Sequence, residues 1–112
     1  MTRFPIIVAI GALAAVLAAA TGLSAASAGG HVTEVAIDGT RFQPRDVTVA
    51  VGDTVIWTNK DPFPHNVSSK AGGFQSKNLN PDQSFRFRAT KRGTFSYVCT
   101  LHPTMAAVIH VK

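Results

Sequence analysis

The chain has 112 residues, of which 46% are hydrophobic, and its formal net charge is +5 at pH 7. A chain of this length holds one folded domain with a small hydrophobic core. Because Cys99 is the only cysteine, no disulfide within the chain can stabilise that core.

The first 28 residues have the layout of a secretory signal. Arg3 is followed by an uncharged, mostly apolar run that ends in the small residues Ala26-Ser27-Ala28. The alternative is a transmembrane anchor, which needs about 20 strongly apolar residues. The stretch 6–20 is shorter and rich in alanine. We therefore predict a signal peptide over residues 1–28, cleaved after Ala28, and export to the periplasm or the extracytoplasmic face.

Removal of this segment leaves residues 29–112 as a single domain with a net charge of +4, since only Arg3 is lost. Exported domains of this size commonly gain stability from disulfides or from a metal. A lone thiol in an oxidising compartment is a liability unless it is buried or bound. A bound metal is therefore the leading candidate for stabilising this domain.

Cleavage after Ala28 would leave Gly29-Gly30-His31 at the new N-terminus. A free amine, two amides and an imidazole in this order can wrap a square-planar Cu(II) or Ni(II) ion. The alternative is that His31 simply begins the first strand. Gly29, Gly30 and His31 thus form a conditional N-terminal copper or nickel site, which depends on the cleavage position.

The rest of the chain shows short alternating runs broken by turn residues, and no long run has the 3.6-residue period of a helix. The alternation predicts strands over 31–37, 47–51, 54–59, 84–88, 94–99 and 107–111. Glycine, proline and aspartate mark the turns between them. About seven or eight short strands without repeats predict an all-β fold, a Greek-key β-sandwich.

Four side chains in this domain suit a metal ion. Cys99, His102 and Met105 follow one another at three-residue spacing, on a loop between two predicted strands, and His65 lies in an earlier loop. A thiolate and two imidazoles with a weak axial thioether form the ligand set of copper electron-transfer sites. Since the sulfur ligands favour Cu(I) and the imidazoles serve both oxidation states, such a site changes little on gaining an electron.

Several segments together resemble the cupredoxins, the type 1 blue copper proteins, and most closely their amicyanin and plastocyanin branch. The resemblance covers nearly all of residues 32–112. It is carried by Phe42-Gln43-Pro44, Val51-Gly52-Asp53-Thr54-Val55, Trp57-Thr58-Asn59, Pro64-His65-Asn66-Val67, Gly93-Thr94-Phe95-Ser96-Tyr97 and the segment from Cys99 to Met105. It implies one type 1 copper ion, with His65, Cys99 and His102 as equatorial ligands and Met105 as the axial ligand.

The resemblance also implies which residues surround the ligands. In the family, the asparagine after the first histidine donates its backbone N–H to the thiolate, and its side chain binds the residue after the cysteine. Asn66 and Thr100 occupy these positions here. The family often has proline where this chain has Leu101, and leucine restores a backbone N–H. We expect this N–H to donate to the Cys99 sulfur and to raise the reduction potential.

Other interpretations of the four ligands remain open from the residues alone. Cys99 lies on the same face of the predicted strand as Phe95 and Tyr97, which is predicted to point inward, and could be a plain buried cysteine. Met105 could fill a gap beneath the loop, and the histidines could be ordinary loop residues. Zinc is the rival metal, but structural zinc usually binds more thiolates, and catalytic zinc holds water as its fourth ligand.

The resemblance implies that the ring of His102 reaches the surface within an apolar patch. The candidate docking patch consists of Phe63, Pro64, Leu101 and Pro103. A small apolar contact suits a carrier that must dissociate quickly from its redox partners, a donor and an acceptor. The net positive charge favours an acidic partner. We expect a monomer that binds no nucleic acid and does not insert into a membrane after signal cleavage.

The sequence therefore predicts a small exported type 1 copper protein that shuttles single electrons by cycling between Cu(II) and Cu(I). The alternative is copper transport outside the cytoplasm, as a chaperone or a buffer. We expect no enzymatic activity and no catalytic residues, because four histidines in one domain leave too few ligands for the additional copper sites of a multicopper enzyme.

His110, which alternates with Ile109 and Val111, is predicted to be a surface histidine.

Overall fold

The computed structural model describes residues 2, 3, 5 and 30–112. Nearly all of the predicted signal peptide, together with its cleavage site, lies outside the described residues. In the described part of the chain, no helix is long and apolar enough to cross a membrane. All the strands found in the described residues lie between residues 30 and 112.

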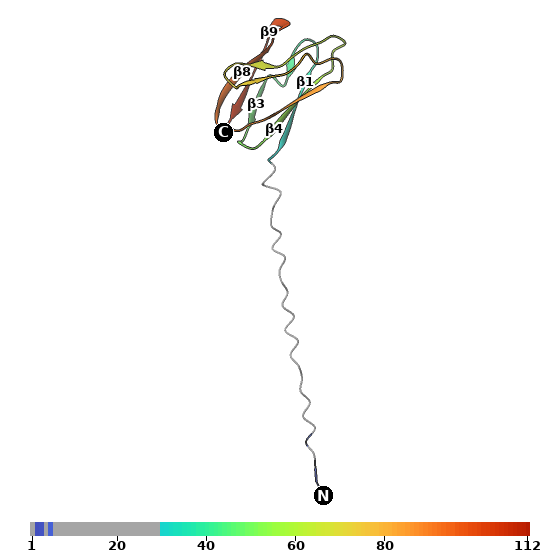
Figure 1. The fold of residues 1–112 in the computed structure, drawn as a ribbon, viewed down its shortest axis with the longest axis vertical. Helices are drawn as coiled ribbons and strands as arrows, with labels where there is room; N and C mark the ends of the chain where they lie inside the picture. Colours follow the sequence, from blue (N-terminus) through green and yellow to red (C-terminus); the bar gives the residue numbers. More distant parts are fainter. Residues whose placement is uncertain (1, 4, 6–29) are drawn as a thin grey trace.

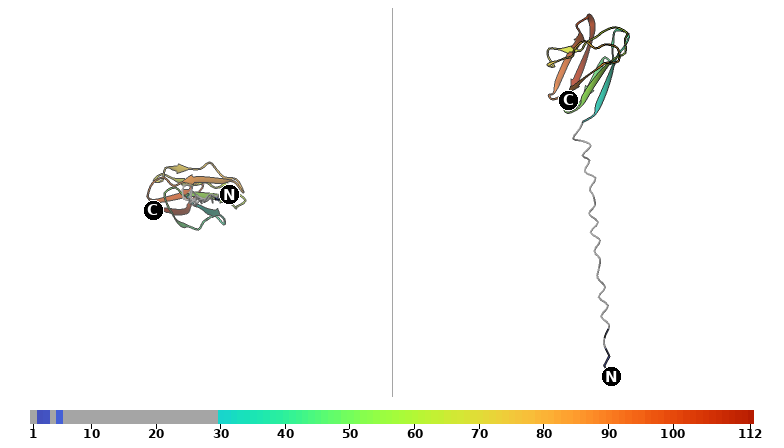
Figure 2. Two further views of the ribbon diagram at one scale, coloured as in Figure 1. Left: turned by 90° about the horizontal axis from the view of Figure 1, so that it is seen from below. Right: turned by 45° about the vertical axis from the view of Figure 1, so that its right-hand side comes forward.

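Residues 30–112 form a sandwich of two β-sheets (Figure 1). One sheet has the strand order β2-β1-β4-β7, and the other has the order β3-β9-β8-β5-β6. In the right-hand view of Figure 2, the cyan and green strands β1 and β4 lie on one side, and the orange and red strands β8 and β9 lie on the other. The all-β sandwich predicted from the alternation is confirmed. The strands are β1 (Val32–Ile37), β2 (Phe42–Gln43), β3 (Asp46–Val49), β4 (Thr54–Asn59), β5 (Ser68–Ser69), β6 (Phe74–Gln75), β7 (Ser84–Arg88), β8 (Gly93–Cys99) and β9 (His102–Val111).

The first sheet is built around β1 and β4, which pair in parallel along their whole lengths, and β7 pairs antiparallel with β4. Alternation along β4 turns Val55, Trp57 and Asn59 inward, and all three are fully buried. The Trp57 ring meets the Tyr97 ring of the other sheet edge to face, with 5.4 Å between ring centroids. The aromatic side chains thus join the two layers of the sandwich.

In the second sheet, β8 and β9 form the central antiparallel pair. Phe95, Tyr97 and Cys99 are buried on one face of β8, which confirms the inward parity predicted from the sequence. The regular pairing ends at the last residue of β8. Val98 pairs with Ala106, whereas Cys99 pairs with His102. This register shift gives β9 a bulge of three residues, 103–105, which we call the β9 bulge.

The strands differ from the sequence prediction in number and length. Nine strands occur in the described residues where seven or eight were expected, and β2, β5 and β6 have only two residues each. Two residues are too few to show an alternating pattern. β9 begins at His102 rather than at Ala107. The segment predicted as a loop is therefore a tight turn at Thr100 and Leu101 followed by a bulged strand.

Candidate metal centre

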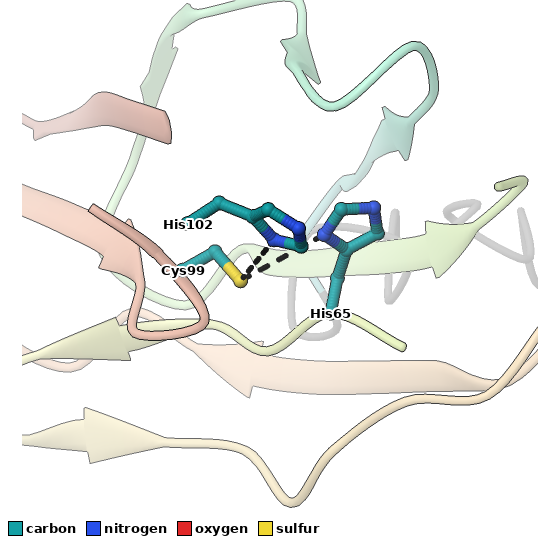
Figure 3. Close-up of side chains that lie close together, drawn as sticks. All are labelled: His65, Cys99 and His102. Carbon is teal, nitrogen blue, oxygen red and sulfur yellow. Dashed lines mark hydrogen bonds between the residues drawn. The ribbon is translucent and has the colours of Figure 1, made fainter. Parts of the chain in front are cut away.

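Three side chains meet at the end of the sandwich where β8 ends. His65, Cys99 and His102 point toward one another (Figure 3), and their ligand atoms all lie within 4.8 Å of one another. Nδ1 of His65 and Nδ1 of His102 each lie 3.7 Å from Sγ of Cys99. Cys99 and His65 are fully buried, and His102 is half-buried. The structure thus brings together three of the four predicted ligands.

These distances fit a metal ion bound by all three side chains. On a first-row ion, a thiolate sulfur lies at about 2.3 Å and an imidazole nitrogen at about 2.0 Å. With an angle of roughly 120° between the two bonds, the nitrogen and the sulfur lie about 3.7 Å apart. Both Nδ1–Sγ distances in the structure, 3.7 Å, have this trigonal spacing.

Met105, a thioether, is the fourth predicted ligand. It lies in the β9 bulge, close in sequence to His102, and its side chain is 4% exposed. Cysteine, two histidines and a thioether together form the donor set of copper electron-transfer sites. Structural zinc sites usually contain more thiolates, and catalytic ones keep a position open for water. The chemistry of the donor set therefore favours copper over zinc.

His65 is held by a residue that the sequence did not single out. Nε2 of His65 lies 2.8 Å from Oδ2 of Asp61. The same carboxylate accepts hydrogen bonds from the backbone N–H groups of Gly39 and Thr40, each at 2.8 Å. With the ring proton on Nε2, the lone pair on Nδ1 is free to bind a metal beside the Cys99 sulfur. Asp61 therefore orients the ligand.

The charge of Asp61 follows from these contacts. Burial raises the pKa of its carboxyl, but hydrogen bonds from Thr40, Gly39 and His65 outweigh burial and hold this pKa below the ordinary value of 3.8. The carboxylate is thus ionised at neutral pH. In the sequence, Asp61 is one of the aspartates that mark the turns between strands. Its place four residues before a ligand histidine, in the same loop, was the available signal.

Asn66 connects the two segments that carry the ligands. Its backbone N–H donates to Sγ of Cys99 at 3.3 Å. Its side-chain Nδ2 donates to Oγ1 of Thr100 at 2.7 Å, and its Oδ1 accepts from the Thr100 backbone N–H at 2.9 Å. Asn66 and Thr100 thus make the contacts expected from the sequence. These hydrogen bonds hold the His65 loop against the end of β8.

The expected hydrogen bond from Leu101 to the sulfur is not formed. Among the residues that the structure describes, the backbone N–H that donates to Sγ of Cys99 is that of Asn66. Leu101 lies in the turn between Cys99 and His102, and its side chain is 46% exposed. Cys99 and His102 pair directly across this two-residue turn.

All four residues of the candidate docking patch are exposed, and Leu101 and Pro103 flank His102 in the sequence. Phe63 is 40% exposed, and Pro64, Leu101 and Pro103 are also exposed. The Phe63 ring centroid lies 5.1 Å from that of His65 and 5.8 Å from that of His102. The apolar surface is therefore continuous with the ligand side chains.

The conditional N-terminal site is only partly described, because Gly29 lies outside the described residues. The backbone N–H of His31 donates to Oδ1 of Asp53 at 2.8 Å. Square-planar metal binding would use this same nitrogen after deprotonation, so the ion would have to displace this hydrogen bond.

The remaining histidine, His110, has Nδ1 3.3 Å from Oγ1 of Thr94. His110 is half-buried rather than fully at the surface, because β8 and β9 pair at this position.

Comparisons with known sequences agree with this geometry. Residues 7–111 match the family model of the cupredoxin-like domain. Amicyanin-alpha from Methylorubrum extorquens is 34% identical over 115 residues, which cover 90% of this chain and 97% of that protein. Amicyanin from Paracoccus versutus is 30% identical over 95 residues, which cover 80% of this chain and 72% of that protein.

Solved structures share the same fold. A Cu(I) form of an amicyanin mutant matches with a TM-score of 0.67 and 29% identity, over 72% of this chain and 82% of that chain. A copper-containing nitrite reductase from Thermus scotoductus matches with a TM-score of 0.68 and 28% identity, over 71% of this chain but 22% of that chain. The family match spans the sandwich and the site together. The chain belongs to the cupredoxin family of type 1 copper proteins.

Proposed function

We propose that this protein carries single electrons between redox partners, with one type 1 copper ion bound by His65, Cys99, His102 and Met105. The observation that carries the proposal is the convergence of two imidazole nitrogens on one buried sulfur, each 3.7 Å from it. The similarity to amicyanins over most of the chain supports the same role.

The protein's contribution is to hold the donor atoms in one arrangement. A bound copper ion supplies a one-electron couple between Cu(II) and Cu(I). Asp61 fixes the His65 ring, and Asn66 bonds to the sulfur of Cys99 through contacts that do not involve the ion. Ligands that are already in place move little when an electron arrives. A small rearrangement means a low barrier to electron transfer.

His102 is the ligand through which electrons enter and leave. It is the one histidine ligand that is not fully buried, and the exposed residues Leu101 and Pro103 of the docking patch flank it in the sequence. A partner protein that covers the exposed Phe63 and Leu101 side chains comes close to the His102 ring. A contact of this small size suits a complex that forms and separates quickly.

Burial of the ligands argues against the alternative role of copper transport. His65 and Cys99 have 0% exposure, so a receiving protein could not replace these ligands without opening the site. Nothing in the comparisons favours transport. An enzymatic role has no better support, because the similarity to nitrite reductase covers 22% of that chain and does not justify transfer of its reaction.

Export places this carrier in the periplasm or at the extracytoplasmic face. The support is the signal-like layout of residues 1–28 and the complete burial of the lone thiol of Cys99. Mass spectrometry of the protein purified from its native cell tests this placement. A mature N-terminus at Gly29 in the soluble extracytoplasmic fraction agrees with it. An uncleaved chain in the cytoplasm would contradict it.

Voltammetry combined with a copper-transfer assay tests the proposed function. The copper-loaded protein should give a reversible one-electron wave and should keep its ion during many redox cycles in the presence of a copper chelator. His102→Asn should lose the reversible wave. The matched control is His110→Asn, a histidine on the same strand that lies away from the sulfur, and it should keep the wave. Rapid release of copper to the chelator on reduction would favour transport instead.

A further inference from the structure

A groove with two arginines lies beside the metal centre. Its lining residues come from the segment 40–45, between β1 and β3, and from the segment 104–106 at the β9 bulge, and its volume is about 570 Å³. The buried axial ligand Met105 is one of the lining residues. We call this feature the basic groove.

The charge of the basic groove is uncompensated. Arg41 and Arg45 are exposed lining residues, and no acidic residue lines the groove. Asp38 and Asp46 lie nearby in sequence, but in the described part of the chain no carboxylate lies within 4.0 Å of either guanidinium. By contrast, Nζ of Lys60 lies 3.8 Å from a carboxylate oxygen of Asp82. The two guanidinium groups are therefore free to bind carboxylates from another molecule.

The backbone beneath the groove is fixed. Asp38 and Arg41 exchange two backbone hydrogen bonds, of 3.0 and 3.3 Å, around a turn in which Gly39 and Thr40 have φ values of 63° and 58°. A positive φ is unusual for a β-branched residue such as Thr40. Asp61 stabilises it by accepting the N–H groups of Gly39 and Thr40. The carbonyl of Arg45 is likewise held, by the N–H of Val108 at 3.0 Å.

The groove adjoins both the docking patch and the ligands. Pro103 of the docking patch directly precedes Thr104 of the groove in the β9 bulge, and both residues are exposed. The carboxylate of Asp61 binds both the turn that leads to Arg41 and the His65 ring. An apolar centre with a charged margin is the usual anatomy of a protein interface.

We propose that the basic groove binds an acidic surface segment of the redox partner, with neighbouring carboxylates placed on Arg41 and Arg45 while the docking patch covers His102. This inference rests on the proposed electron-carrier function and extends it by naming the chemistry of the partner. The arginines steer the partner and set its orientation, and the apolar patch supplies the contact through which the electron passes.

Titration of the reduced, copper-loaded protein with a hexaglutamate peptide tests the proposal. The protein is labelled with nitrogen-15, and its amide signals are followed at low ionic strength. The largest shifts should fall on residues 40–45 and 104–106. The double variant Arg41→Gln/Arg45→Gln should bind the peptide about tenfold more weakly, because two charge-assisted contacts are lost.

The matched control is Lys91→Gln/Arg92→Gln, which removes the same charge next to the beginning of β8, at the end of that strand opposite to Cys99. Its affinity should stay within about twofold of that of the unchanged protein. An equal loss of affinity in both double variants would show that only net charge matters, and no loss in either would show that the two arginines do not bind the peptide. Either result would overturn the proposal. Shifts confined to residues outside the groove would do the same.

Voltammetry on the same samples separates the two proposals. If the arginine double variant keeps a reversible wave but binds the peptide as tightly as before, the groove is not the docking site and the carrier function stands. If the unchanged protein gives no reversible wave, the carrier function fails, whatever the peptide binding shows.

Discussion

Asn66 and Thr100, which lie 34 residues apart in the chain, bind each other through two hydrogen bonds of 2.7 and 2.9 Å. The pair joins the loop that carries His65 to the turn that follows Cys99. Because the N–H of Asn66 also donates to the sulfur, the same residue sets the position of the thiolate. The relative position of the two ligand segments is thus fixed by protein contacts as well as by the metal.

Replacement of Thr100 by valine should destabilise the protein. The change removes the hydroxyl that accepts from Nδ2 of Asn66 and keeps the size of the side chain. Loss of this partly buried bond should lower the free energy of unfolding by about 1–2 kcal/mol. Urea denaturation of the copper-loaded protein measures the change. Thr48→Val, at an exposed position of β3, is the control, and a loss as large as that of Thr100→Val would contradict the account.

Asp61→Asn should weaken both folding and metal binding. The amide that replaces the carboxylate cannot accept from Gly39, Thr40 and His65 together. We expect the free energy of unfolding to fall by roughly 2–3 kcal/mol and the copper affinity to fall by about 10–100-fold, since the ring of His65 loses its orienting partner. Denaturation and a competition titration with a chelator measure the two effects.

The control for this substitution is Asp82→Asn, which removes an exposed ion pair with Lys60 whose side chains are 85% and 52% exposed, respectively. Such pairs contribute about 0–1 kcal/mol. Its copper affinity should not change. Equal effects of Asp61→Asn and Asp82→Asn on copper affinity would show that general charge, and not orientation of the histidine, is responsible.

Met105→Leu should change the reduction potential more than the stability. Leucine has a similar volume, so the buried position should lose less than about 1.5 kcal/mol of unfolding free energy. The thioether stabilises Cu(II) as a weak axial donor, and its loss should raise the potential. Voltammetry measures the potential. A potential equal to that of the unchanged protein would mean that Met105 is not a ligand.

Asp53 should make the folded state sensitive to acid. Hydrogen bonds from the N–H groups of His31 and Ala50 lower the pKa of the Asp53 carboxyl from its ordinary value of 3.8, and burial opposes them only in part. A carboxyl whose pKa is lower in the folded state stabilises that state above the unfolded pKa, and this contribution is lost as the pH falls through the folded pKa.

Asp53→Asn should therefore be less stable than the unchanged protein at pH 7, and the difference should shrink below about pH 4. Urea denaturation of the metal-free forms at pH 7, 5 and 3 measures it. A difference that stays constant down to pH 3 would show that the ionised carboxylate is not the cause.

The sequence predicted those parts of the structure that depend on local pattern. The bounds of β4 and β7 agree with the predicted runs 54–59 and 84–88, because alternation along a half-buried strand is visible in the residues themselves. The β9 bulge was missed, because it arises from how β9 pairs with β8. The residue that orients His65 was also missed. The contact of Asp61 with Gly39 and Thr40 joins separate segments and leaves no periodic signal.

The resemblance to cupredoxin motifs predicted a ligand that residue spacing alone could not assign, namely His65. Cys99 and His102 are close in sequence, but the closeness of His65 to the Cys99 sulfur depends on the packing of one loop against the end of β8. The expectation for Leu101 failed because it was argued from the presence of an N–H group. The presence of an N–H group does not fix its direction, and Leu101 lies in the two-residue turn between the paired residues Cys99 and His102.

The visible spectrum after addition of one equivalent of Cu(II) tests the central claim most directly. A thiolate bound to Cu(II) in a trigonal site gives an intense visible band, so the protein should turn blue and bleach reversibly on reduction. Cys99→Ser, which removes the sulfur that lies 3.7 Å from two imidazole nitrogens, should stay colourless. A colourless unchanged protein after stoichiometric loading, or an undiminished band in Cys99→Ser, would contradict a type 1 copper site.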